Sequence, residues 1–184
     1  SQFYNVYAYD KQPSKSVIVG HSDNSNEPTP INIATLVENC NIIFICVPTP
    51  MFEDGECDTR IVEAVIEDIA KEAEFQNRDI ITIIKSTVPP GTTDKLNGLS
   101  NKIGVVFSPE FLTEANSLQD FLNPNMQILG GDWTDCEYVE RLYVNHSNVR
   151  VVPTFKVDLI TASMLKYTIN SWLATKETFF NELR

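Results

Sequence analysis

Short apolar segments rich in β-branched residues alternate along this chain with segments whose apolar residues recur every three or four positions. Several of the β-rich segments are apolar at consecutive positions, which is typical of strands covered by helices on both faces of a parallel sheet. The pattern predicts an α/β fold with a doubly wound, Rossmann-like and mostly parallel sheet, followed by a long helix. The predicted strands are residues 5–9, 41–47, 79–84, 103–107, 126–129 and 148–152.

Helical periodicity is clearest between the second and third predicted strands, where Asp58 is placed to cap a helix. After the third strand, Pro90 to Thr93 are expected to open another helix, and a further amphipathic helix is predicted over residues 134–145. The first of these helices is expected to bury Ile61, Val62, Val65, Ile66, Ile69, Ala70 and Ala73. The last is expected to bury Tyr138, Val139 and Leu142.

The last stretch of the chain, from about residue 157 to residue 183, contains neither Pro nor Gly and is predicted to form one helix of roughly 40 Å. A small sheet cannot cover a helix of this length. An apolar seam exposed to water would be unfavourable, so a second domain or a second copy of the chain is expected to bury it. The seam consists of Ala162, Leu165, Ile169, Trp172, Phe179 and Leu183.

Composition narrows the function classes. With 14 basic against 25 acidic residues, the formal charge of −11 repels nucleic acid and acidic lipid surfaces, so neither is an expected partner. No apolar run approaches the roughly 20 residues of a membrane helix, and the first residues do not look like a leader, so a cytoplasmic protein is expected. The four cysteines lack zinc-like spacing and are predicted to be reduced, mostly buried thiols, with no metal site.

Polar residues follow the predicted strands, at the edge where doubly wound sheets bind ligands. Asp10 could accept hydrogen bonds from the ribose hydroxyls of an adenosine, or it could simply form a turn. Thr49 offers a hydroxyl within Val47–Pro50, a segment that could equally be a rigid strand exit. Ser86 and Thr87 stand where a cofactor would lie, whereas Thr92 and Thr93 are better interpreted as turn and cap residues.

Two segments each carry a pair of polar side chains four residues apart, a spacing that puts both on one face of a helix. In the first segment, Ser108 is expected to cap a helix whose dipole keeps Glu110 charged, with Glu114 one turn later. In the second, Lys166 and Asn170 pair an amine with an amide. Acids in first helical turns and solvated Lys-x-x-x-Asn pairs are both common, but together the pairs suggest chemistry on an alcohol.

Four motifs, in order, resemble the nucleotide-sugar dehydrogenase family, the UDP-glucose and GDP-mannose 6-dehydrogenases. They are Ile43–Pro50, Lys85–Thr93, Phe107–Glu114 and Lys166–Lys176, and the similarity extends from about residue 41 onward. The resemblance implies NAD as cofactor and a nucleotide sugar as substrate, with UDP-glucose converted to UDP-glucuronate as the first candidate. It implies a four-electron oxidation of the C6 alcohol, through an aldehyde that a cysteine captures and a thioester that water hydrolyses.

The resemblance also implies roles for residues of this chain. Lys166 and Asn170 would hold the C6 oxygen, while Glu110 would act as general base on a water that Thr87 orients. Glu114 would lie near both ligands, and Phe111 and Leu112 would contact the substrate through their backbone. Together with Glu114, the residues expected to bind NAD are Asp10, Lys15, Val47, Thr49, Ser86 and Thr87.

The chain departs from the family pattern at both ends. No Gly-x-Gly-x-x-Gly precedes Asp10, and residues 21–30 look like a loop in place of helical structure. None of the four cysteines lies in a glycine-rich context like that of the family nucleophile. We therefore expect residues 1–153 to be an incomplete NAD-binding domain and residues 154–184 to begin a central dimerisation helix. The chain is expected to be a fragment or a reduced relative that does not complete the oxidation alone.

Two other interpretations stay open at this point. A hydroxyacid dehydrogenase of the wider superfamily would need Lys166 and Asn170 but no thiol, and the segment from Ser108 to Glu114 argues against it. A non-enzymatic nucleotide-binding or dimer-forming module would associate through the terminal helix without NAD-dependent turnover.

Overall fold

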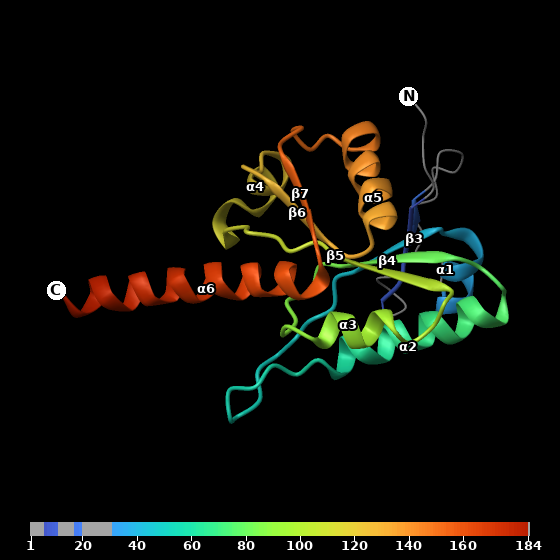
Figure 1. Cartoon of the computed structure of the whole chain (residues 1–184), viewed down its shortest axis with the longest axis horizontal. Helices are drawn as coiled ribbons and strands as arrows, with labels where there is room; N and C mark the ends of the chain where they lie inside the picture. The colour runs from blue at the N-terminus through green and yellow to red at the C-terminus, as the bar shows by residue number, and fades with distance from the viewer. Residues whose placement is uncertain (1–5, 11–16, 20–30, 184) are drawn as a thin grey trace.

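The centre of the molecule is a five-stranded sheet in the order β3-β4-β5-β6-β7 (Figure 1). The computed structural model describes residues 6–10, 17–19 and 31–183. Its strands β3, β4 and β5 run parallel, β6 is antiparallel to β5, and β7 is parallel to β6. The predicted doubly wound, mostly parallel sheet is therefore confirmed. The strands are β3 Ile42–Ile45, β4 Ile80–Ile84, β5 Ile103–Phe107, β6 Gln127–Gly130 and β7 Thr154–Val157.

Helices cover both faces of the sheet, as Figure 1 shows. On one face lie α1 (Ile33–Asn39), α2 (Arg60–Phe75) and α3 (Thr92–Asn97), and on the other lies α5 (Trp133–His146). Because strand side chains alternate between faces, the isoleucines of β4 are shared between two cores. Ile80 and Ile84 belong to the core that includes α2, and Ile83 packs with Val139 and Tyr143 of α5.

The helix predicted after the second strand is α2, and its periodicity is confirmed. It buries Val62, Ile66, Ile69, Ala70 and Ala73, whereas Ile61 and Val65, also expected to be buried, are half-buried. Its cap differs from the prediction, because Thr59 occupies the N-cap position and Asp58 precedes it. The Asp58 carboxylate still accepts a hydrogen bond from the backbone N–H of Arg60, at 3.1 Å.

The helices predicted after the third strand and over residues 134–145 are both present. The helix expected at Pro90 to Thr93 is α3, whose N-cap Gly91 has a φ of 89°, a conformation that favours glycine. The helix expected over 134–145 is α5, but Tyr138 does not face the core, being 50% exposed. The buried row of α5 is Cys136, Val139 and Tyr143, so burial of Val139 is confirmed, whereas Leu142 is half-buried.

The strand predicted at 5–9 is β1 (Val6–Ala8), and it does not join the main sheet. It pairs antiparallel with β2 (Val17–Val19), a strand that the sequence pattern did not predict. Its backbone hydrogen bonds thus go to a local hairpin partner rather than to β3. The loop expected over residues 21–30 lies outside the described residues.

The strand predicted at 148–152 is wrong, because the last strand of the sheet is β7 at Thr154–Val157. The Arg150 N–H donates to the carbonyl of Leu122, the last residue of α4 (Ser117–Leu122), so this segment bonds to the end of a helix and not to a strand. The ladder begins where Gln127 N–H donates to the carbonyl of Pro153. The sheet therefore extends past the domain boundary that we expected at residue 153.

The helix predicted to start at Ser108 is also wrong. Residues 108–113 are not helical, and helical structure begins only with the turn η2 (Glu114–Asn116) and α4. The Ser108 N–H donates to the Ile84 carbonyl at 3.0 Å, which continues the pairing with β4 instead of opening a helix. Glu110 and Glu114 therefore do not share a helix face, and no helix dipole acts on Glu110.

The long terminal helix is confirmed as α6 (Leu159–Glu182), capped by the Asp158 carboxylate, which accepts from the Thr161 N–H at 2.7 Å. Its first turns pack on the sheet, where Leu159 and Ala162 are buried. The rest projects away from the sheet (Figure 1). The exposed apolar residues there include Trp172, Phe179, Phe180 and Leu183.

The structure also bears on the expectations about membrane helices and cysteines. Among the described helices, none is long and apolar enough to cross a membrane. All four cysteines are free, but only Cys136 is buried; Cys40 and Cys57 are half-buried and Cys46 is exposed. The expectation of mostly buried thiols is therefore wrong, because Cys46 follows the last residue of β3 and lines a cavity.

Candidate functional site

A cavity of 710 Å³ lies at the carboxyl ends of β3 and β4, on the side of the sheet covered by α5. Its wall is largely apolar, with Phe44, Leu142 and Tyr143 among its residues, and a few polar groups converge on it. This combination is typical of sites for small organic ligands. The polar residues that line it include Cys46, Thr49, Lys85, Ser86, Thr87, Glu110 and His146.

The two strand ends are tied together by a serine. Ser86 is buried, and its hydroxyl donates to the Val47 carbonyl at 2.6 Å. Its backbone N–H also donates to the Ile45 carbonyl at 3.3 Å. Ser86 therefore holds Val47 and Thr49 at the cavity edge, beside Thr87. All four are residues that the sequence placed at a cofactor site, and the structure brings them together.

Lys166 and Glu110 meet across 56 positions of sequence. The Lys166 ammonium donates to the backbone carbonyl of Glu110 and lies 3.2 Å from its carboxylate Oε1. Lys166 is only 5% exposed, although it lies on a helix that projects into solvent. A buried ammonium needs such partners, because removing it from water is otherwise unfavourable.

Glu110 holds its carboxylate between this ion pair and the cavity. Its Oε1 faces Lys166, while its Oε2 is buried and has no hydrogen-bond partner in the described part of the chain. A carboxylate oxygen in this state is a strong acceptor without a donor. The side chain can therefore accept a proton or a hydrogen bond from a group that enters the site.

The two residues after Glu110 contact different parts of the site. Phe111 lies under the Lys166 ammonium, which is 5.3 Å from the ring centroid, and Leu112 lines the cavity. A cation over an aromatic face is attracted by the ring quadrupole, so Phe111 helps to fix Lys166. Asn170 lies one turn beyond Lys166 on α6 and is exposed.

Three sequence-predicted residues remain, and the structure describes the side chain of only Asp10 among them. Asp10, two positions after β1, is exposed and is not among the residues that line the cavity. Glu114 is the first residue of η2. Lys15 lies outside the described residues.

Lys85 was not predicted as a site residue, although it is the first residue of the motif Lys85–Thr93. It lies one position after β4, lines the cavity, and donates to the Ser108 hydroxyl at 3.3 Å. Burial lowers the pKa of Lys85, the nearby Glu110 carboxylate acts to raise it, and the Lys166 ammonium acts to lower it. A lysine directly after an apolar strand is the signal that would have found it.

Cys46 and Tyr143 complete the wall beside Lys85. Burial raises the pKa of the Cys46 thiol, and Lys85 and Glu110 act on it in opposite directions. Burial also raises the pKa of Tyr143, against a hydrogen bond with the Ser108 hydroxyl that acts to lower it. Both groups are therefore neutral near pH 7. No sequence pattern indicates Tyr143.

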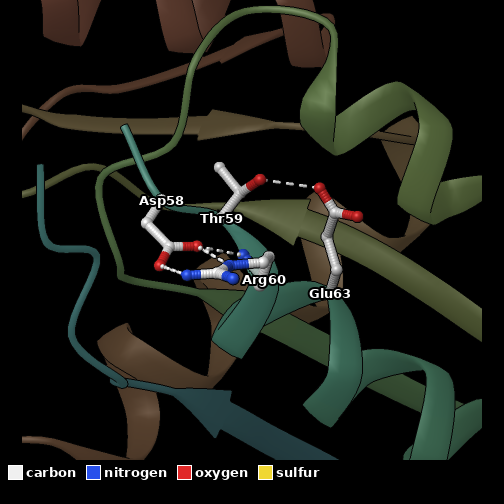
Figure 2. A network of polar contacts seen from close by, with 4 residues as sticks. All are labelled: Asp58, Thr59, Arg60 and Glu63. Atoms are coloured by element: carbon white, nitrogen blue, oxygen red, sulfur yellow. Dashed lines mark hydrogen bonds and ion pairs between the residues drawn. The ribbon is translucent and has the colours of Figure 1, made fainter. Parts of the chain in front are cut away.

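A hairpin leads from the cavity edge to the start of α2. Its strands bridge at Met51 and Cys57, and Asp58 ends it with only 7% of its surface exposed. Figure 2 shows how Arg60 fixes this carboxylate, with Nε at 2.8 Å and a terminal nitrogen at 2.6 Å. Beside it, the Thr59 hydroxyl donates to Glu63 at 2.7 Å. The arrangement anchors the hairpin on the helix.

The hairpin also contacts Thr87 and α6. The Cys57 thiol donates to the Thr87 carbonyl at 3.8 Å. Burial raises the pKa of Tyr167, next to Lys166, to about 12, and interaction with Cys57 adds to the rise. Cys57 therefore joins the hairpin to both halves of the candidate site. No group of three or more His, Cys, Asp or Glu residues within the described ranges is arranged to hold a metal ion.

Residues 8–147 match the NAD-binding domain of the UDP-glucose/GDP-mannose dehydrogenase family. The chain belongs to this family. A UDP-glucose 6-dehydrogenase of Rickettsia conorii is 37% identical over 152 residues, which cover 80% of this chain and 34% of that protein. A putative UDP-glucose 6-dehydrogenase of Bacillus subtilis is 37% identical over 161 residues, covering 82% and 36%.

Solved structures of the family share the fold. A UDP-glucose dehydrogenase of Pyrobaculum islandicum aligns with a TM-score of 0.74 at 31% identity, covering 83% of this chain and 36% of that one. A GDP-mannose dehydrogenase of Pseudomonas aeruginosa aligns with a TM-score of 0.74 at 29% identity, covering 82% and 36%. The chain thus spans about a third of the length of the family members it matches.

NAD is the cofactor of the matched domain. The cavity suits it chemically, because apolar walls accommodate a flat ring and the hydroxyls of Thr49 and Thr87 can bond polar groups. Its position outside the carboxyl ends of parallel strands is also where doubly wound sheets bind dinucleotides. The residues present therefore fit the cofactor.

Proposed function

We propose that this chain carries the NAD-binding half of an enzyme that oxidises the C6 alcohol of a nucleotide sugar, with UDP-glucose as substrate and UDP-glucuronate as product. The observation that supports this most is the buried contact between Lys166 and Glu110 at the cavity edge. It places a cation and a carboxylate at one point. Oxidation of an alcohol needs both, one to stabilise negative charge on oxygen and one to take up a proton.

In this proposal Lys166 holds the sugar C6 oxygen. Its ammonium stabilises the negative charge that develops on that oxygen as the hydroxyl proton leaves. Asn170 is the second donor, four residues later on the same helix. Bound NAD supplies the hydride acceptor.

Glu110 is the general base for the water steps in this proposal, and its buried Oε2 is the free acceptor that such a base requires. Thr87 orients the water, and its carbonyl is held by the Cys57 thiol. Phe111 and Leu112 contact the substrate, and Glu114 lies between substrate and cofactor. Asp10, Lys15, Val47, Thr49 and Ser86 contribute to the cofactor site.

We further propose that the complete protein contains sequence beyond this chain that supplies the nucleophilic thiol. Two observations support this. The chain spans about a third of the length of each relative, and none of its four cysteines lies in a glycine-rich segment. Cys136 is buried, and burial raises its pKa to about 11, so it is a poor nucleophile. We also propose that residues 1–153 form an incomplete NAD-binding domain and that residues 154–184 begin a dimerisation helix.

The complete protein tests the proposal through the stoichiometry of NADH. Oxidation of an alcohol to a carboxylate releases two hydrides, so each UDP-glucose should yield two NADH. GDP-mannose and UDP-N-acetyl sugars, supplied in parallel, are expected to react more slowly. One NADH per sugar would indicate a two-electron dehydrogenase, and absence of NADH with every sugar would refute the proposed activity.

A further inference from the structure

Lys85 occupies a position where an apolar side chain would be expected. Strand residues two apart point to the same face, so Lys85 follows Ile83 onto the side of the sheet that α5 covers. There it lines the cavity beside Phe44 and Tyr143. A methionine would fill similar space without bringing a charge, so the ammonium itself needs an explanation.

The ammonium of Lys85 has few partners for its position. An ammonium carries three donors, and the described part of the chain gives it one hydrogen bond, to the Ser108 hydroxyl at a long 3.3 Å. Lys85 is half-buried, and a single neutral acceptor at this distance does little to balance its charge. A negative group nearby is therefore expected to contribute.

Glu110 is the nearest candidate, because its side chain and that of Lys85 line the same cavity and Ser108, which Lys85 contacts, is two residues before it. Its Oε1 is taken by Lys166, and its Oε2 is buried without a hydrogen-bond partner in the described residues. The Glu110 charge acts on Lys85 in the direction expected of an opposite charge nearby, and Lys166 acts in the direction expected of a like charge. The other titratable groups on this cavity include the Cys46 thiol, from the end of β3, and Tyr143 and His146, from α5.

We propose that Lys85 is a positioning residue for Glu110, a second amine beside its carboxylate in addition to Lys166. The cluster then holds two positive charges and one negative charge. This inference gains its catalytic meaning from the proposed function. When Lys166 turns to a substrate oxygen, Lys85 continues to balance the Glu110 charge, so the base stays in place and ionised.

The coupling between Lys85 and Glu110 is reciprocal, so it can be measured on the lysine. NMR of a chain labelled with ¹³C at the lysine side chains follows the titration of each ammonium, and Lys85→Arg assigns the Lys85 signal. Glu110→Gln removes the facing charge, and we expect it to lower the pKa of Lys85 by about 1 unit or more. Glu110→Asp, which keeps the charge, should restore most of the shift.

Three further variants separate charge coupling from a structural effect. Lys166→Met removes a like charge and should raise the pKa of Lys85, a shift opposite in sign to that from Glu110→Gln. If Glu110→Gln does not fold, Lys166→Met still tests the charge coupling. Asp79→Asn, which removes the partner of Lys102 at the other end of the sheet, should leave Lys85 unchanged. Ser108→Ala should shift it less than Glu110→Gln does.

The titration needs neither NAD nor substrate, so its result is independent of whether the proposed function holds. Opposite shifts from Glu110→Gln and Lys166→Met, with no shift from Asp79→Asn, are the expected result. The proposed role of Lys85 would be overturned if its pKa were the same in Glu110→Gln and Asp79→Asn. It would also be overturned if only Ser108→Ala shifted that pKa.

Discussion

The Lys166 ammonium on α6 lies 3.2 Å from the Oε1 of Glu110, in a segment that follows β5. This contact ties the long helix to the ligand-binding edge of the sheet. It also explains why a lysine on a projecting helix is buried, since Glu110 supplies both a carbonyl and a carboxylate to the same ammonium. The position of α6 on the sheet therefore determines the geometry of the candidate site.

Gly130 is expected to be essential for that position. A Cβ at Gly130 would lie 2.5 Å from the Cβ of Ala162 and 3.0 Å from the Asp158 carbonyl, both at the start of α6. Gly130→Ala should therefore push α6 away from β6 and lower the free energy of unfolding by about 1–3 kcal/mol. Denaturant unfolding followed by circular dichroism measures this change.

Gly98→Ala is the matched control for that substitution. A Cβ at Gly98 meets nothing closer than 3.6 Å, and its φ of −85° suits any residue. A change within about 0.5 kcal/mol is expected. Equal effects of the two substitutions would show that the close approach of α6 to β6 does not limit stability.

Asp135 is predicted to make stability depend on pH. Its carboxylate packs over Gly104, and burial raises its pKa, with the Asp132 charge adding to the rise. The folded state thus binds the proton more tightly than the unfolded chain, so the ionised side chain destabilises the fold above its folded-state pKa. This penalty disappears as the pH falls below the value of the unfolded chain, about 3.9.

Asp135→Asn removes the charge and should raise Tm by about 1–3 °C at neutral pH, with no gain near pH 3. Thermal unfolding by calorimetry across this range measures the difference. Asp68→Asn, at an exposed position on α2, is the control and should change Tm little at either pH. A gain from Asp135→Asn that is the same at both pH values would contradict the assignment to charge.

The exposed end of α6 predicts association. Trp172 and Phe179 are 60% and 59% exposed, and burying such side chains against a second copy is favourable. We expect the protein to form a homodimer through this helix. Substituting both residues by Glu should weaken the dimer at least about tenfold in sedimentation equilibrium, because the new charges would be buried.

Glu177→Lys, on the same helix, controls for a general effect of changing charge there and should leave the association unchanged. Retention of the dimer after both aromatic residues are replaced would place the contact elsewhere.

Patterns confined to one element were predictable from sequence. The rows of apolar residues on α2 and the uninterrupted length of α6 needed only periodicity, and both are confirmed. Strand β4 was predicted to within one residue because Ile80–Ile84 is bounded by polar residues. Four of the predicted site residues, Val47, Thr49, Ser86 and Thr87, follow strands that were predicted and therefore meet at the cavity.

Errors arose where distant partners overrode local signals. Ser108 and Pro109 are good helix openers, but the Ser108 N–H pairs with Ile84 and Lys166 binds the Glu110 carbonyl. Residues 148–152 are rich in valine, yet Arg150 pairs with Leu122 instead of a strand. Tyr143 reaches the cavity from α5, where its ring contacts Phe44 of β3, and no local pattern indicates this contact.

Replacing Lys166 by Ala tests the central claim most directly, with Lys176→Ala on the exposed part of α6 as the matched control. The claim is that Lys166, held by Glu110, stabilises the developing charge on the sugar oxygen. Rapid mixing of the complete protein with NAD and UDP-glucose measures the rate of the first NADH formed. We predict a fall of about 10²–10³-fold for Lys166→Ala and no change for Lys176→Ala. A near-normal rate for Lys166→Ala in a folded protein would contradict the account.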